Sequence, residues 1–262
     1  MVDPPPKSRA LTPRRAALTD ADLELLRFLS EHRFVLPDHA AALLGVTPVT
    51  AQRRLDRLAG GGYARRAAVF KGRPPMHLIT AAGLRVLGST LPTPNLDLHN
   101  YQHDIGVAWL WLAARRGTFG PLSEILAERT LRSRDGATDR ESQAREALGV
   151  RLGGTGARGR ERLHYPDLLL RTADRRWVAL ELELSSKGRT RLESILSGYG
   201  SDPRIAGVVY LVHSQTVARS LERAARKVGV SDLVHLQRVR FKVAQPAAAR
   251  PVALERASGV AR

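Results

Sequence analysis

Residues 180–185 alternate strictly between leucine and a polar side chain, in the order Leu-Glu-Leu-Glu-Leu-Ser. A period of two predicts a β-strand, because successive side chains of a strand point to opposite faces. The leucines then share one face, and Glu181, Glu183 and Ser185 share the other. Two carboxylates on one face of an apolar strand cost free energy unless cationic groups meet them. We therefore expect a strand whose carboxylates have cationic partners.

The chain around this strand predicts an α/β (α+β) fold with a mixed sheet. A strand over residues 165–172 and a turn at 173–175 precede it, and a helix, a buried strand, a second helix and a last strand follow it. Upstream, residues 95–117 have the spacing of a long helix. The next segment, LSEILAERTLR, fits a strand or a helix, and its periodicity does not decide between them.

The N-terminal part of the chain predicts three short helices. The first begins at the capping residue Thr19, and the second begins at Pro37 and ends at Gly45. The third has a proline in its first turn, after the N-cap Thr47. Its apolar residues share one face, and its opposite face carries Thr50 and several arginines.

A β-hairpin with a basic tip is predicted after the third helix, formed by YARRAAVF, a turn and MHLIT. Three helices and a hairpin over residues 19–90 resemble the winged helix-turn-helix domains of bacterial DNA-binding proteins. We expect Thr50 and Arg53 to face base edges or phosphates. The residues expected to hold phosphates are Arg54, Arg57, Arg65, Lys71 and Arg73. The alternative is a solvated arginine face in a chain that is rich in arginine throughout.

Segments of biased composition divide the chain. Residues 1–18 and 241–262 have no apolar period, and we expect a flexible basic arm and a flexible tail. The stiff segment Leu-Pro-Thr-Pro at 91–94 separates the two predicted domains, 19–90 and 95–240. A further segment, 132–162, is polar, glycine-rich and densely charged, and it predicts a long mobile loop inside the second domain.

A third carboxylate belongs to the same region of the predicted sheet. Asp167 lies at the start of the adjoining strand and can approach Glu181 and Glu183 from the neighbouring position. Three carboxylates that converge make an oxygen site suited to Mg²⁺ or Mn²⁺. The alternative is an exposed edge strand whose carboxylates pair with Arg189 or Arg191 and carry no chemistry.

The order Pro-Asp, thirteen residues, Glu-Leu-Glu within these elements resembles the PD-(D/E)xK nuclease core, which has the restriction-endonuclease-like fold. The resemblance implies that Asp167 and Glu181 bind a divalent metal and that a nearby lysine orients or activates the attacking water. Glu183 stands where the commonest pattern has this lysine, as in some restriction enzymes of the same fold. Lys187 is the nearest substitute, and it reaches the site only if the chain turns promptly into the next helix.

Two histidines of the long helix, His99 and His103, lie four residues apart, which is a spacing of metal ligands. No third ligand with local spacing is present, so packing or a hydrogen bond is the preferred interpretation. Asp104 is a further acidic group that could join the predicted metal site.

The winged helix, the His-Asp segment at 99–104 and the nuclease-like core together resemble the replication-relaxation proteins of actinobacterial plasmids and integrative elements, over residues 19–238. This resemblance implies action on plasmid DNA, and we expect a Mg²⁺- or Mn²⁺-dependent endonuclease or nickase. The expected catalytic residues are Asp167, Glu181, Glu183 and Lys187. The alternative is a non-enzymatic DNA-binding accessory protein or transcriptional regulator with an inactive core. Other plasmid-processing proteins and a second copy of the chain stay open as partners.

Composition agrees with a protein that acts on a polyanion. The chain has 42 Lys and Arg against 25 Asp and Glu, a formal net charge of +17. It has no cysteine, which excludes disulfides, thiolate nucleophiles and cysteine zinc sites. No apolar run approaches the roughly 20 residues of a bilayer span, and no signal-peptide core is present. We therefore expect a cytoplasmic protein without a membrane partner.

Overall fold

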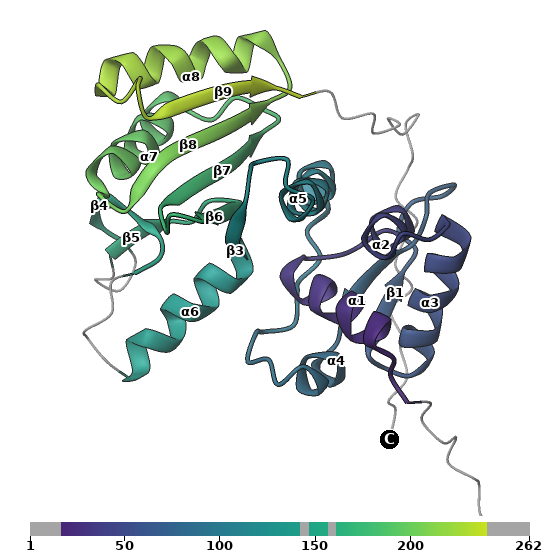
Figure 1. The fold of residues 1–262 in the computed structure, drawn as a ribbon. Helices are drawn as coiled ribbons and strands as arrows, with labels where there is room; N and C mark the ends of the chain where they lie inside the picture. The colour runs from purple at the N-terminus through teal and green to yellow at the C-terminus, as the bar shows by residue number, and fades with distance from the viewer. Residues whose placement is uncertain (1–16, 142–146, 157–160, 240–262) are drawn as a thin grey trace, which may run out of the picture.

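The computed structural model describes residues 17–141, 147–156 and 161–239. The arm and tail expected at the two ends lie outside these residues, except for residues 17 and 18. The described residues form a mixed α/β fold with a helical N-terminal half and a five-stranded mixed sheet (Figure 1). No helix in these ranges is long and apolar enough to cross a bilayer.

The N-terminal half contains the three predicted helices and the predicted hairpin. Its elements are α1 (Asp20–Glu31), α2 (Pro37–Leu44), α3 (Pro48–Gly60), β1 (Ala64–Ala67), β2 (Met76–Ile79) and α4 (Ala81–Val86). Gly45 ends α2 with a φ of 66°, a left-handed conformation that glycine adopts without strain. β1 and β2 pair antiparallel, and Val35 forms an isolated antiparallel bridge to His77 on the outer side of β2.

The side chain of Asp22 joins two of these helices. Thr19 and Asp22 form a capping box at the start of α1, in which the Asp22 carboxylate accepts hydrogen bonds from the Thr19 backbone N–H and hydroxyl. The same carboxylate also accepts from Arg54 at 3.0 Å and from Arg57 at 2.5 Å, both on α3. Asp22 is 1% exposed. A buried charge therefore fixes α3 against α1.

The second half is built on one sheet. Its strands are β3 (Leu122–Ala127), β6 (Leu168–Thr172), β7 (Trp177–Glu183), β8 (Ile205–Val212) and β9 (Val234–Arg238), in the order β3-β6-β7-β8-β9. The first three strands are antiparallel neighbours, and β7, β8 and β9 run parallel. The strand that carries Glu181 and Glu183 is thus the central one, and the edge-strand alternative is wrong.

Helices cover both faces of the sheet. Two of them, α7 (Arg189–Ser201) and α8 (Gln215–Val228), pack on one face, while α5 (Tyr101–Arg115), which follows a short 3₁₀ helix η1 (Leu98–Asn100), packs on the other. Leu180 and Leu182 belong to the core under α5. The predicted alternation along β7 is confirmed, because Glu181 lies on the opposite side, against α7.

The prediction of a long mobile loop over 132–162 is wrong for the part of this range that the structure describes. The segment contains most of α6 (Glu128–Glu141), then β4 (Val150–Thr155) and the start of β5 (Glu161–His164). A few contacts order it despite its polar composition: Val150 is buried, as is Leu131 directly before the segment, and the Asp135 carboxylate accepts the backbone N–H groups of Leu148 and Gly149. The undecided segment before it is a strand followed by a helix that begins at Glu128.

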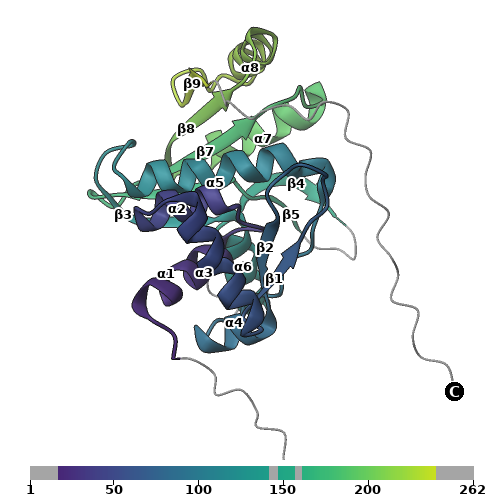
Figure 2. The same ribbon diagram turned by 90° about the vertical axis from the view of Figure 1, so that its right-hand side faces the viewer.

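Helix α5 lies between the two halves in Figure 1 and belongs to both hydrophobic cores. Ala108 and Leu112 pack with α1, α2 and α3, whereas Leu110 and Ala114 pack with the sheet. The hairpin loop lies beside the start of α5, as Figure 2 shows, and the rings of Phe70 and Tyr101 are 4.9 Å apart there.

Candidate active site and nucleic-acid interface

Glu181 lies near the end of β7 and is 2% exposed. One of its carboxylate oxygens, Oε1, accepts a hydrogen bond from the Tyr199 hydroxyl of α7 and lies 2.6 Å from His164 Nε2 at the end of β5. Burial alone would raise the pKa of Glu181, but the neighbouring His164 and the other donors lower it below its usual value. Glu181 is therefore an ionised, buried carboxylate held in a fixed position.

Asp167 lies immediately before β6, at the same end of the sheet. Its Oδ2 accepts the backbone N–H of Leu182 at 2.7 Å and lies 3.1 Å from His103 Nε2 on α5. The register of β6 on β7, with Leu168 opposite Leu180, brings Asp167 next to Glu181 across the two strands. The two residues therefore lie at the same end of the sheet, and the side-chain partners of their carboxylates come from helices on opposite faces.

Lys187 reaches this acidic group. The chain turns directly after β7, and Lys187 Nζ forms an ion pair with Glu183 Oε2. Burial would lower the pKa of Lys187, but the charges of Glu181, Glu183 and Asp167 outweigh it and raise the pKa. Burial also raises the pKa of Glu183 above its usual value. The ammonium group thus lies within the field of all three predicted carboxylates.

The two predicted histidines have different surroundings. The side chain of His99 is 99% exposed, whereas that of His103 is 30% exposed and contacts Asp167. The preferred interpretation of His103, a hydrogen bond, is confirmed. Burial would lower the pKa of His103, but the charges of Asp167 and Asp104 raise it to about 10. His103 is accordingly a cation.

Asp104 and Arg33 extend this network toward the N-terminal half. The Asp104 Oδ1 atom lies 3.8 Å from His103 Nδ1 and 3.8 Å from Arg33 Nε, and Arg33 also pairs with Glu128 at 3.4 Å. A small cavity of about 30 Å³, lined by these residues and by Asp167, lies beside them. Asp104 therefore acts on Asp167 through His103 and makes no direct hydrogen bond to it.

The donor set is compatible with a two-carboxylate metal site. Within the described ranges, no group of three His, Asp or Glu side chains is placed to hold a metal ion. Mg²⁺, however, is usually held by one or two carboxylates and keeps several waters. The hydrogen bonds described above use Asp167 Oδ2 and Glu181 Oε1, so each residue keeps a second carboxylate oxygen, and Asp167 and Glu181 are the residues that would hold the ion.

Sequence reasoning missed the residues that hold the carboxylates. His164 and Tyr199 each contact Glu181, and neither was a candidate. A partial signal was present for His164, because it stands three residues before Asp167 in a polar segment that leads into a buried strand. The sequence contained no such signal for Tyr199, since an aromatic residue in an amphipathic helix is ordinarily part of the core.

The predicted DNA-binding residues of α3 fall into two groups. Thr50 and Arg53 are exposed on its first two turns, and no acidic group in the described residues pairs with Arg53. Arg54 and Arg57 instead hold Asp22, so part of their charge is already neutralised. The side chain of Arg57 remains 50% exposed and that of Arg54 28%. The freely available cation of this helix is therefore Arg53.

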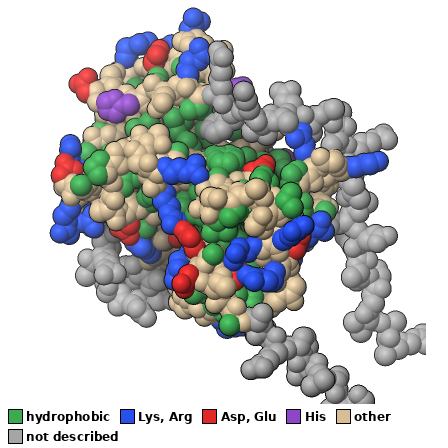
Figure 3. Space-filling view, turned by 45° about the vertical axis from the view of Figure 1, so that its right-hand side comes forward, with side chains coloured by type: hydrophobic (Ala, Val, Ile, Leu, Met, Phe, Trp, Pro, Cys, Tyr) green, Lys and Arg blue, Asp and Glu red, His purple; other side chains and the backbone are tan. Residues whose placement is uncertain are grey.

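The hairpin supplies further cations. Arg65 on β1 and Lys71 in the connecting loop are exposed, while Arg73 is half-buried. On the face shown in Figure 3, Lys and Arg side chains lie on both halves of the protein with acidic side chains among them. The candidate interface is therefore defined by where the cations of α3 and the hairpin lie, and not by the overall charge of the protein.

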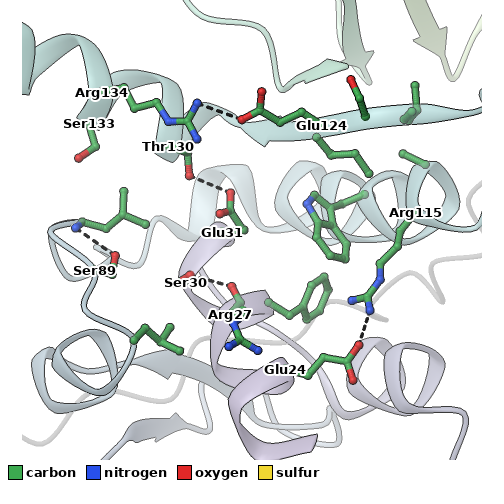
Figure 4. A pocket seen from close by; sticks show the side chains of 18 of the residues that line it. Glu24, Arg27, Ser30, Glu31, Ser89, Arg115, Glu124, Thr130, Ser133 and Arg134 are labelled. Atoms are coloured by element: carbon green, nitrogen blue, oxygen red, sulfur yellow. Dashed lines mark hydrogen bonds and ion pairs between the residues drawn. The ribbon is translucent and has the colours of Figure 1, made fainter. Parts of the chain in front are cut away.

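A cavity of about 1070 Å³ lies between the two halves, lined by α1, α5, β3 and α6. Figure 4 shows that acidic and polar or basic side chains pair along its walls: Arg115 with Glu24, Thr130 with Glu31, and Arg134 with Glu124. None of the predicted site residues lines this cavity. The carboxylate site is therefore separate from it.

Comparison of the sequence with models of protein families and with curated proteins found no match.

Proposed function

We propose that the chain is a DNA-binding protein of the replication-relaxation type that cleaves or nicks double-stranded DNA with a divalent metal. In this proposal α1–α3 and the β1–β2 hairpin form a winged helix-turn-helix, and the sheet with α5 and α7 forms a PD-(D/E)xK-like core. We further propose that the protein acts in the cytoplasm on plasmid DNA. Its proposed partners are a second copy of the chain and other plasmid-processing proteins.

One observation carries the catalytic part of the proposal: Asp167 and Glu181 lie at the same end of the sheet, and Lys187 lies within the field of both. A buried strand with carboxylates on one face is costly unless charges nearby stabilise them. Here a lysine four residues past Glu183 returns to the acidic group, as a substitute for the missing lysine must. Packing alone does not require a lysine at this position.

Each residue has a role that follows from its contacts. Asp167 and Glu181 would hold Mg²⁺ or Mn²⁺, which when bound polarises the phosphate and lowers the pKa of a bound water. Lys187 orients that water, and Glu183 positions Lys187 through their ion pair. Tyr199 and His164 fix Glu181, and the Leu182 N–H fixes Asp167.

A specific observation favours a second candidate, a DNA-binding accessory protein without catalysis. Cationic or donor groups already contact both proposed metal ligands: His103 contacts Asp167, and His164 contacts Glu181. A group that already contacts a carboxylate oxygen competes with a metal ion for that oxygen. The core would then be a stable platform, and DNA binding would be the whole activity.

Supercoiled plasmid incubated with Mg²⁺ or Mn²⁺ separates the two candidates. We expect the wild-type chain to produce nicked or linear plasmid, and Asp167→Asn and Glu181→Gln to lose this product. Asp174→Asn is the matched control, because Asp174 is an exposed residue of the β6–β7 turn that pairs with Arg176. Binding of a labelled duplex is measured for all four proteins at the same time.

The outcomes are distinct. Loss of product in the two site variants, with duplex binding and the control intact, supports the nuclease. No product from any of the proteins, with duplex binding retained, favours the accessory protein. Equal cleavage by wild type and both site variants contradicts the assignment of the site.

The interface has its own prediction, which uses Arg53→Ala. Removing one phosphate contact should weaken duplex binding and reduce the slope of log K against log salt concentration by about 0.9. Arg85→Ala is the matched control, since Arg85 is an exposed arginine of the same half that lies on α4. We avoid Arg57→Ala, because it would also remove a partner of buried Asp22. The same slope for wild type and Arg53→Ala in duplex titrations would move the interface away from α3.

A further inference from the structure

The first turn of α3 exposes an apolar side chain that the fold does not use. Val49 is 61% exposed, the highest value among the large hydrophobic side chains of the described residues. It belongs to none of the hydrophobic clusters, either as a buried member or as a partly buried neighbour. Valine is also a poorer helix former than alanine. Neither packing nor helix propensity explains its presence.

The surroundings of Val49 are those of a contact surface. Its neighbours Thr47, Pro48 and Thr50 are exposed as well, and Arg53 lies one turn further on the same side. The hydroxyls of Thr47 and Thr50 hydrogen-bond to each other at 3.0 Å. The methyl groups of Val49 and the guanidinium of Arg53 are therefore the groups that this end of α3 offers most freely.

We infer that Val49 contacts the methyl group of a thymine in the major groove, an inference that rests on the proposed DNA binding through α3. Thymine is the base whose major-groove edge carries a methyl group, and apolar side chains recognise it by contact. Single exposed apolar residues are common on protein surfaces. This one is at the first turn of the helix proposed to enter the groove, where the contact would determine sequence preference.

The position of Arg53 indicates where along the DNA the thymine should lie. The Arg53 guanidinium is the proposed phosphate contact of this end of α3, and a phosphate contact fixes the position of a helix on the duplex. Four residues of helix rise about 6 Å, and stacked bases on one strand are about 3.4 Å apart. The thymine should then lie roughly two base steps from the phosphate that Arg53 contacts.

The test begins with a pool of random-sequence duplexes selected on the full-length wild-type chain. Each thymine of the selected duplex is then replaced in turn by deoxyuridine, which lacks only the methyl group. We expect one replacement to weaken binding about fourfold, the effect of one buried methyl-sized group. In Val49→Ser the same replacement should have no effect, whereas in the control Val86→Ser, at an exposed valine of α4, it should weaken binding as in wild type.

Two results would overturn the inference. Either no thymine of the selected duplex responds to loss of its methyl, or the response is unchanged in Val49→Ser. In both cases wild-type binding to duplex persists, so the proposed function stands. If the wild-type chain retains no duplex from the pool, the proposed function fails and this inference fails with it.

Discussion

The variant Asp22→Ala should lower the free energy of unfolding by about 2 to 4 kcal/mol, a large part of the stability of an ordinary domain. The substitution removes the N3 side chain of the capping box, which accepts two hydrogen bonds from the N-cap residue Thr19. It also removes the charge-assisted hydrogen bonds from Arg54 and Arg57. The carboxylate is almost fully buried, so water does not replace these contacts on the side of α1.

Urea unfolding followed by circular dichroism measures this effect. The matched control is Asp20→Ala, because Asp20 is exposed in the same first turn of α1 and contributes only a favourable interaction with the helix dipole. Equal losses in the two variants would contradict a structural role for the Asp22 contacts.

The same contacts set a pH dependence with a definite sign. Burial would raise the pKa of Asp22, but the hydrogen bonds from Thr19, Arg57 and Arg54 lower it below the ordinary 3.8. A lowered pKa means that the stabilisation is present above about pH 3.8 and is lost as the pH falls through the folded-state value. The difference in stability between wild type and Asp22→Ala should therefore shrink only under strongly acidic conditions.

The second large effect concerns His103 in the metal-free chain. Its pKa rises from 6.5 to about 10 on folding, because the Asp167 and Asp104 carboxylates outweigh the cost of burial. A raised histidine pKa stabilises the fold fully below about pH 6.5, and this stabilisation disappears as the pH rises toward 10. Allowing for the partial exposure of the ring, we expect a loss of about 2 to 4 kcal/mol across that window.

Unfolding measured between pH 6 and 10, with EDTA present, checks this expectation. The variant His103→Gln should lack this component of the pH dependence, since glutamine does not titrate. His99→Gln is the control, because the exposed His99 side chain lies outside the contacts of Asp167. Parallel stability curves for wild type and His103→Gln would show that the Asp167 contact does not stabilise a charged imidazole.

The alternation along residues 180–185 predicted β7 and the faces of its side chains, because a period of two leaves one solution once the strand is assigned. The periodicity of the sequence could not identify the residues that those side chains contact. His164 and Tyr199 precede and follow Glu181 by 17 and 18 residues and reach it from different elements. Whether a buried carboxylate meets an arginine, a histidine or a tyrosine depends on how helices pack on the sheet.

Helix periodicity likewise showed which face of α3 is polar and left open what that face contacts. Arg54 and Arg57 were expected to hold phosphates, and both reach Asp22 of α1, which is 32 and 35 residues earlier in the chain. At 132–162 the composition predicted a mobile loop, and this prediction was wrong for the described residues. The polar character of the segment concealed Val150, which anchors β4 in the core, while Leu131, directly before the segment, anchors α6.

The shared position of α5 limits how the protein can be divided. A cut at residues 91–94 would deprive the N-terminal fragment of Ala108 and Leu112, which complete its core. The C-terminal fragment would keep this helix but expose the same apolar residues to water, together with part of Trp109. Despite their separate folds and proposed tasks, the two halves are not interchangeable modules. Recombination that exchanges one half for that of another protein would have to replace one face of α5 as well.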